Sequence, residues 1–181
     1  FTVIRNGAFL GIVVAAIFSC VAQVGAGEVG VQSLFGSVQD GTLRSGFNIV
    51  NPLVKVDAMD IRTQAYTMSS LRDEGQQSGD DAISSLSMDG LTLKLDVTVW
   101  FRLSENDAPQ VYRTIGTDYV EKIVRPAVRT AIRDVSVGYS ATDIYSIKRE
   151  DFVRDITKNL ENAFNGRGII LERVLLRNVE L

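Results

Sequence analysis

Between Arg5 and Glu28 the chain carries no charged residue, and most of the side chains in between are apolar. A helix that crosses bilayer hydrocarbon needs about 20 mostly apolar residues, and this stretch has that length. The residues after Glu28 have the mixed composition of a water-exposed domain. The sequence therefore predicts a retained transmembrane anchor over residues 7–26, followed by a body outside the membrane.

Three other interpretations of this segment stay open. A cleaved signal peptide would use Arg5, the apolar stretch and the small residues at 24–26, although its core is normally only ~7–15 residues long. A lipoprotein would use Cys20, although Phe18 stands where a small residue is expected. The third is a buried helix of a soluble protein, in which uncharged runs this long are rare. For an anchor, the absence of cations between Arg5 and Arg44 places the body on the extracytoplasmic side.

Small residues recur at every fourth position of the predicted anchor, which places them on one face of a helix. Two helices can approach closely along such a face, so we expect anchors to pack against one another there. The alternative is the ordinary abundance of glycine and alanine in membrane helices. The residues concerned are Gly7, Gly11, Ala15 and Ser19.

Composition excludes several classes of chemistry. The chain has no histidine, which excludes Ser-His-Asp and Cys-His catalysis and histidine-based metal sites. Its single cysteine, Cys20, can form no disulfide within the chain. A net charge of −3 gives no general basic field for nucleic acid. Residues 25–30 match G-x-G-x-x-G, but a membrane-length run precedes them and a strand pattern follows, so we expect no nucleotide site. The sequence thus predicts a non-enzyme without cofactor or metal.

The clearest element of the body is residues 91–103, where apolar and polar side chains alternate strictly. This period of two predicts a long strand with one buried face. Trp100, on its polar face, is expected to pack against a neighbouring element or to mark an interface. Upstream we expect a hairpin that turns near residues 35–37. Residues 69–90, rich in Ser, Gly, Asp and Gln, are predicted to be a loop with a short structured piece at 82–86.

Helical spacing of apolar residues dominates the second half of the body. Asp118 and Glu121 form the pattern of a capping box at the start of the longest helix. Pro126 lies inside that helix and should kink it, because proline removes one backbone hydrogen bond. The predicted helices cover residues 108–115, 118–135 and 148–164, and a strand is expected over 169–181.

Four basic residues follow one another on the second of these helices at spacings of three, four and four: Lys122, Arg125, Arg129 and Arg133. Such a stripe is either a solvated helix face or a subunit interface. For the interface, the predicted partners in an adjacent subunit are Asp151, Asp155 and Glu161.

Several segments, in this order, resemble the stomatin–prohibitin–flotillin superfamily, also called SPFH or Band 7. In the first half they are GEVGV at 27–31, FGSV at 35–38 and GFNIVNP at 46–52. In the second half, which is most similar to prohibitins, they are VYRTIGTDY at 111–119, PAVR at 126–129 and GIILERVLL at 168–176.

The resemblance implies an α+β fold. It divides the chain into a transmembrane anchor (7–26), a first SPFH half rich in antiparallel strands (27–103) and a second, mixed helix and strand half (104–181). Two features depart from the prohibitin pattern. The loop at 69–90 is longer than usual, and the coiled coil expected after the last strand is absent from this chain, which suggests a truncated sequence.

The resemblance also implies a function. Prohibitin-like proteins are non-enzymatic scaffolds that form a ring or cage around a patch of membrane, organise lipids and regulate FtsH-type AAA membrane proteases. The expected partners are further copies of this chain, a paralogous chain, the bilayer and such a protease. The expected location is a bacterial or organellar inner membrane, crossed once. The alternative is a stomatin-like organiser of membrane domains that regulates channels or transporters.

Overall fold

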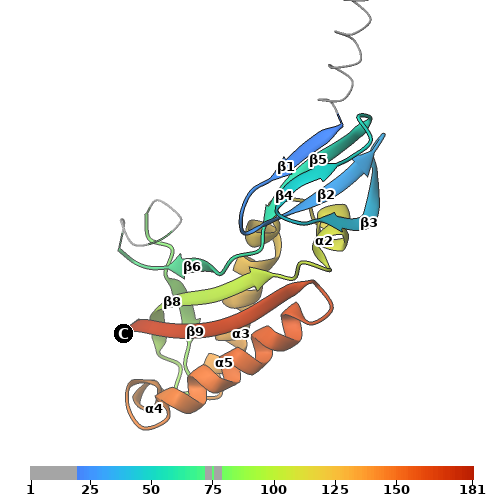
Figure 1. Cartoon of the computed structure of the whole chain (residues 1–181). Coiled ribbons are helices and arrows are strands. Elements are labelled where there is room, and N and C mark those ends of the chain that lie inside the picture. Colours follow the sequence, from blue (N-terminus) through green and yellow to red (C-terminus); the bar gives the residue numbers. More distant parts are fainter. Residues whose placement is uncertain (1–19, 72–74, 76–78) are drawn as a thin grey trace, which may run out of the picture. The chain divides into compact units, whose positions relative to one another are not determined.

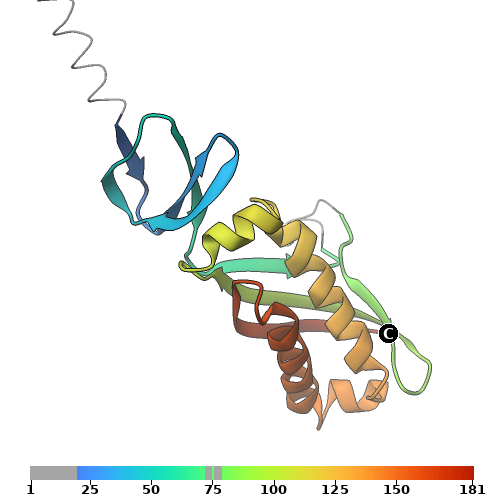
Figure 2. The same ribbon diagram turned by 90° about the vertical axis from the view of Figure 1, so that its right-hand side faces the viewer.

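The computed structural model describes residues 20–71, 75 and 79–181 (Figures 1 and 2). These residues form two compact units that interleave along the sequence. Unit 1 contains the described residues up to Arg62 and the segment Glu105–Thr117, and unit 2 contains Thr63–Ser104 and Asp118–Leu181. This division differs from the predicted boundary at 103/104, because the long central strand of unit 2 pairs with strands from both predicted halves.

Unit 1 consists of five short strands and one helix. A two-stranded antiparallel sheet pairs β1 with β4, and a three-stranded antiparallel sheet has the order β3-β2-β5. The predicted hairpin is confirmed, and its turn uses the left-handed backbone of Phe35 and Gly36. The elements are β1 (Val21–Val24), β2 (Glu28–Leu34), β3 (Ser37–Leu43), β4 (Gly46–Ile49), β5 (Val54–Asp60) and α2 (Ala108–Thr114).

The predicted anchor is too long at its C-terminal end, because β1 occupies part of the segment 7–26. β1 pairs Val21 with Ile49 and Val24 with Gly46, and β-branched valines suit such a pleated ladder. In the described part of the chain, no helix has the length and apolarity needed to cross a bilayer. Gly7, Gly11, Ala15 and Ser19 lie outside the described residues, so anchor packing stays a prediction.

Unit 2 is an antiparallel sheet covered on one face by helices, as Figures 1 and 2 show. β8 is central, with β9 on one side and β6 and β7 sharing the other. The strands are β6 (Gln64–Met68), β7 (Ile83–Leu86), β8 (Thr92–Leu103) and β9 (Ile169–Glu180). The helices are a π-helical turn η1 (Val120–Val124), α3 (Arg125–Ser136), α4 (Ala141–Tyr145) and α5 (Arg149–Phe164). The α+β class is confirmed.

The alternation in β8 correctly predicts a strand and its buried apolar face, in which every second side chain from Leu93 to Leu103 is fully buried. The opposite face is more covered than predicted, because Asp96 and Thr98 are also buried there. Trp100 lies on that face, partly exposed, between Ala65 of β6 and Arg173 of β9. The short structured piece expected within 69–90 is β7.

The capping box of Asp118 and Glu121 stays a prediction. The Asp118 carboxylate pairs with Lys122 at 2.8 Å, and Tyr119, directly before the π turn, provides no side-chain cap. The helix adapts to Pro126 by widening: the Arg125 N–H bonds to the carbonyl of Val120, five residues back. This π turn ends where α3 begins, so that Pro126 occupies the first turn of α3, where its missing N–H is tolerated.

The helix predicted over 148–164 is confirmed as α5. Its apolar residues recur at every fourth position, and all of them are buried: Phe152, Ile156, Leu160 and Phe164. By contrast, the sequence interpretation omitted α4. Its start is capped by Ser140, whose hydroxyl accepts the N–H of Asp143 at 3.1 Å.

Candidate functional site

Unit 1 exposes large apolar side chains on one face of its two-stranded sheet. Directly opposed residues of an antiparallel pair point to the same side, so Val21 and Ile49 share a face. Phe47 points the same way because it lies two residues from Ile49. Phe47 and Ile49 are 79% and 91% exposed, whereas Val24, on the other face, is buried. This face is therefore an apolar surface, not part of the core of unit 1.

Two further exposed apolar side chains, Phe35 and Leu53, lie at the same end of unit 1. β2 and β5 pair Leu34 with Val54, which brings the β2–β3 turn beside the β4–β5 connection. Both lie at the end where β1 begins (Figures 1 and 2). We name the exposed residues at this end the apolar tip: Val21, Phe35, Phe47, Ile49 and Leu53.

Polar contacts hold α2 against the strands of unit 1 and so give the apolar tip a fixed support. The Tyr112 hydroxyl donates to Asp57 at 2.8 Å, and Arg113 donates to Asp40 at 2.5 Å and to the Val38 carbonyl at 3.0 Å. The hydrogen bond to Asp57 also raises the pKa of Tyr112 above its ordinary value, because the carboxylate favours the protonated phenol.

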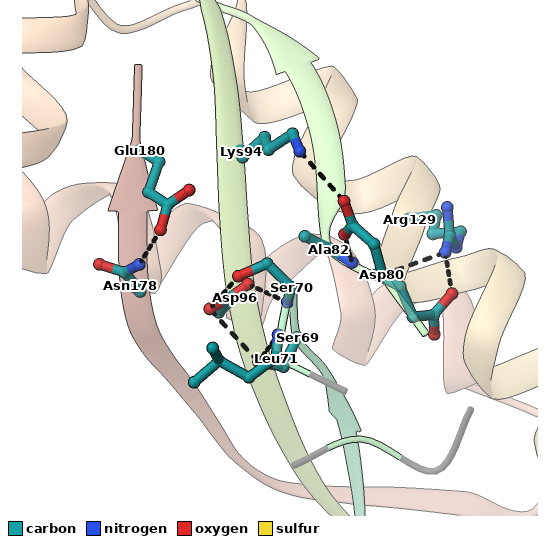
Figure 3. A network of polar contacts seen from close by, with 11 residues as sticks. Ser69, Ser70, Leu71, Asp80, Ala82, Lys94, Asp96, Arg129, Asn178 and Glu180 are labelled. Atoms are coloured by element: carbon teal, nitrogen blue, oxygen red, sulfur yellow. Dashed lines mark hydrogen bonds and ion pairs between the residues drawn. The ribbon is translucent and has the colours of Figure 1, made fainter. Parts of the chain in front are cut away.

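The basic stripe of α3 lies in unit 2 and contacts the segment that leads into β7. Arg125 and Arg129 both donate to the same carboxylate oxygen, Oδ1 of Asp81, the former at 2.5 Å. Arg129 also donates to the Asp81 carbonyl at 3.2 Å (Figure 3), and Arg133 donates to the Ser84 carbonyl at 3.4 Å. The Asp81 side chain is only 6% exposed. Asp81 thus fastens the start of β7 to α3.

A second buried carboxylate organises the start of the 69–90 segment. Asp96, on β8, accepts the N–H of Ser70 at 2.9 Å and the hydroxyls of Ser69 and Ser70 at 3.4 and 3.3 Å (Figure 3). The neighbouring Lys94 pairs with Asp80 at 3.0 Å. Asp81 and Asp96 were not among the site residues selected from the sequence. Their signal is weak, because Asp81 lies in a polar stretch and Asp96 continues the polar face of an alternating strand.

The role of the α3 stripe as a subunit interface stays a prediction. Of the three carboxylates predicted to receive it, two have partners within their own chain. Asp151 pairs with Arg154 at 2.5 Å, and Asp155 accepts the Tyr139 hydroxyl at 2.6 Å. Glu161 is the remaining candidate. The fourth member of the stripe, Lys122, pairs with Asp118.

For metal binding, the described residues contain no group of three or more His, Cys, Asp or Glu side chains arranged to hold an ion. Cys20 immediately precedes β1, and its carbonyl accepts the Val50 N–H at 2.7 Å. The described residues present two surfaces as candidate sites: the apolar tip of unit 1 and the arginine-lined face of α3 in unit 2.

Comparison with known proteins identifies the relatives of this chain. The family model described as "SPFH domain / Band 7 family" matches residues 22–181. Prohibitin-4, mitochondrial, of Arabidopsis thaliana is 28% identical over 160 residues, which make up 86% of this chain and 53% of that protein. The chain thus spans about half the length of this curated relative. These matches confirm the superfamily resemblance: the chain belongs to the SPFH domain / Band 7 family.

Proposed function

We propose that this protein is a non-enzymatic, prohibitin-like membrane scaffold. Many copies assemble side by side into a ring or cage that encloses a patch of membrane, organises its lipids and regulates an FtsH-type AAA protease. Membership of the SPFH family and the similarity to a prohibitin support this role. The structural observation that carries the proposal is the apolar tip, because it lies where the chain leaves the predicted anchor.

The apolar tip would bring unit 1 into contact with the bilayer surface. Burying a large aliphatic or aromatic side chain in an apolar medium is favourable by about 1.5–3 kcal/mol. Phe47 and Ile49 are almost fully exposed, so they would gain most of this value from lipid. The predicted anchor attaches the protein, and the tip restricts how unit 1 can rotate about that attachment.

Assembly then needs only weak lateral contacts. Copies confined to one membrane have a high effective concentration for one another. In a closed ring every copy contacts two neighbours, so many weak contacts together stabilise the assembly. The similarity to a mitochondrial protein supports an organellar membrane, with a bacterial inner membrane as the alternative. The absence of cations between Arg5 and Arg44 favours a body on the extracytoplasmic side.

Imaging of single particles tests the scaffold. The full-length protein is extracted from membranes in a mild detergent, and its oligomeric state is measured before and after removal of lipid. We expect closed rings or cages of many copies. Monomers or dimers would contradict the compartment, and small oligomers would favour the stomatin-like alternative.

Lipid quenching of fluorescence tests the apolar tip separately. In a Trp100→Phe background, which removes the natural tryptophan, Phe47→Trp places the probe in the tip and Leu86→Trp places it on an exposed site of unit 2. The full chain is reconstituted into vesicles whose acyl chains carry bromine. We expect strong quenching at position 47 and little at position 86, whereas equal quenching would contradict membrane contact by the tip.

A further inference from the structure

A groove of about 440 Å³ runs along the outer face of α3. Three guanidinium groups line it, spaced four residues apart on one helix face: Arg125, Arg129 and Arg133. Thr130, whose hydroxyl can donate a hydrogen bond, and Glu121 also line the groove. All of these residues belong to unit 2.

The chain neutralises this groove incompletely. Asp81, which accepts hydrogen bonds from Arg125 and Arg129, contributes one negative charge to the arginines of the groove, and Glu121 contributes a second, 3.7 Å from Arg125. Among the described residues that line the groove or pair with its arginines, two carboxylates therefore face three guanidinium groups. The hydrogen bonds are also incomplete. Within residues 20–71, 75 and 79–181, no partner reaches Oδ2 of Asp81 or the buried Nε of Arg125 and of Arg129. Buried polar groups without partners are uncommon. The two Nε atoms are donors of the kind that an anion can satisfy, whereas Oδ2 of Asp81 is an acceptor and is not.

The geometry points to an added anion at the mouth of the groove. The side chains of Arg125 and Arg129 are 30% and 26% exposed, so each arginine reaches solvent in part while Asp81 holds its guanidinium in place. A pair of fixed, partly desolvated guanidiniums is the arrangement that binds phosphate oxygens in forked pairs. Among the described residues, the Arg133 guanidinium donates one long hydrogen bond, to the Ser84 carbonyl at 3.4 Å, so it has donors left for a ligand.

We propose that the groove formed by Arg125, Arg129, Thr130 and Arg133 binds a phosphate group. The phosphate of a lipid headgroup and that of a free phosphate ester share this chemistry. The observations favour phosphate over a carboxylate of a neighbouring copy, because Asp151 and Asp155 already have partners within their own chain. The inference does not depend on the proposed scaffold.

Calorimetric titration of the full chain with inorganic phosphate, in a neutral maltoside detergent at constant ionic strength, tests the site. Arg133→Gln removes a guanidinium whose hydrogen bond to the Ser84 carbonyl is long, 3.4 Å, so the fold should persist. Hydrogen bonds to charged groups are strong enough that its loss should weaken binding about tenfold or more. The matched control is Arg154→Gln, which removes an exposed arginine from α5 and should leave the affinity unchanged.

A second arm identifies the source of the phosphate. Micelles doped with phosphatidylglycerol should compete with inorganic phosphate if the ligand is a lipid headgroup, and should have no effect if it is a free phosphate ester. The proposal is overturned if the wild-type protein binds neither probe, or if Arg133→Gln binds as the wild type does. It is also overturned if Arg133→Gln changes only the oligomer size, because the groove would then be an interface between copies.

Discussion

Replacing Asp81 by asparagine removes the charge on which two arginines converge while keeping the size of the side chain. Asp81 precedes β7, and its Oδ1 accepts from both Arg125 and Arg129. Its side chain is 6% exposed, so solvent cannot replace the lost charge at that position. After the change, two guanidiniums face each other across a neutral amide.

The expected cost can be worked out from these contacts. Removing one partner of a fully buried charge pair costs about 3–5 kcal/mol. Here about a quarter to a third of each arginine side chain reaches solvent, and the amide oxygen still accepts one hydrogen bond. We therefore expect unit 2 to lose about 2 kcal/mol of unfolding free energy, roughly a thirtyfold change in its folding equilibrium.

Urea unfolding of the full chain measures this cost, with the fluorescence of Trp100 as the signal. Trp100 is the single tryptophan of the chain and lies on β8, so it reports on unit 2 alone. The adjacent Asp80→Asn variant is the control, because Asp80 forms an exposed pair with Lys94 that should contribute less than about 1 kcal/mol. If both variants shift the midpoint equally, the reasoning about burial is refuted.

Three more predictions follow from packing and titration. Gly30→Ala should lower the unfolding free energy by about 1–3 kcal/mol, because the added Cβ would lie 2.9–3.0 Å from Val24, Leu43 and Val56. Thermal melting should show no such loss for the control Gly41→Ala, where the nearest atom is 3.9 Å away. Ile156→Ala should lower the unfolding free energy of unit 2 by about 2–5 kcal/mol, measured by Trp100 fluorescence, since the side chain is fully buried. The hydrogen bond to Asp155 raises the pKa of Tyr139 to about 12. The stability that this pair contributes should therefore be complete below pH 10 and should be lost as the pH rises towards 12. In thermal melts at increasing pH, the Tyr139→Phe variant should lack this alkaline loss of stability.

Sequence periodicity predicted the helices and strands that contact the same core along their whole length. The apolar face of β8 and the stripe of α5 each contact one continuous core, so a period of two or of four appears directly in the sequence. The hairpin at Phe35 followed from local turn chemistry. In these places, neighbours along the chain decide the structure.

Elements that depend on distant partners could not be predicted in this way. β1 reads as the end of an apolar membrane segment, and only its pairing with β4, more than twenty residues later, makes it a strand. Asp81 is one polar residue among many until α3 brings Arg125 and Arg129 to it. The interleaving of the two units also depends on β9, whose pairing with β8 closes the sheet from the end of the chain.

The two proposed contact surfaces lie in different units, and this separation makes them independently testable. The apolar tip is built from β1, β4 and two turns of unit 1, and the phosphate groove from α3 of unit 2. A change at Phe47 should therefore alter lipid contact without changing phosphate affinity, and a change at Arg133 should do the reverse. A scaffold needs such a division, because one surface can hold each copy at the membrane while the other responds to a ligand. If Arg133→Gln also altered lipid quenching at position 47, the two surfaces would be coupled, and binding in the groove would regulate membrane contact.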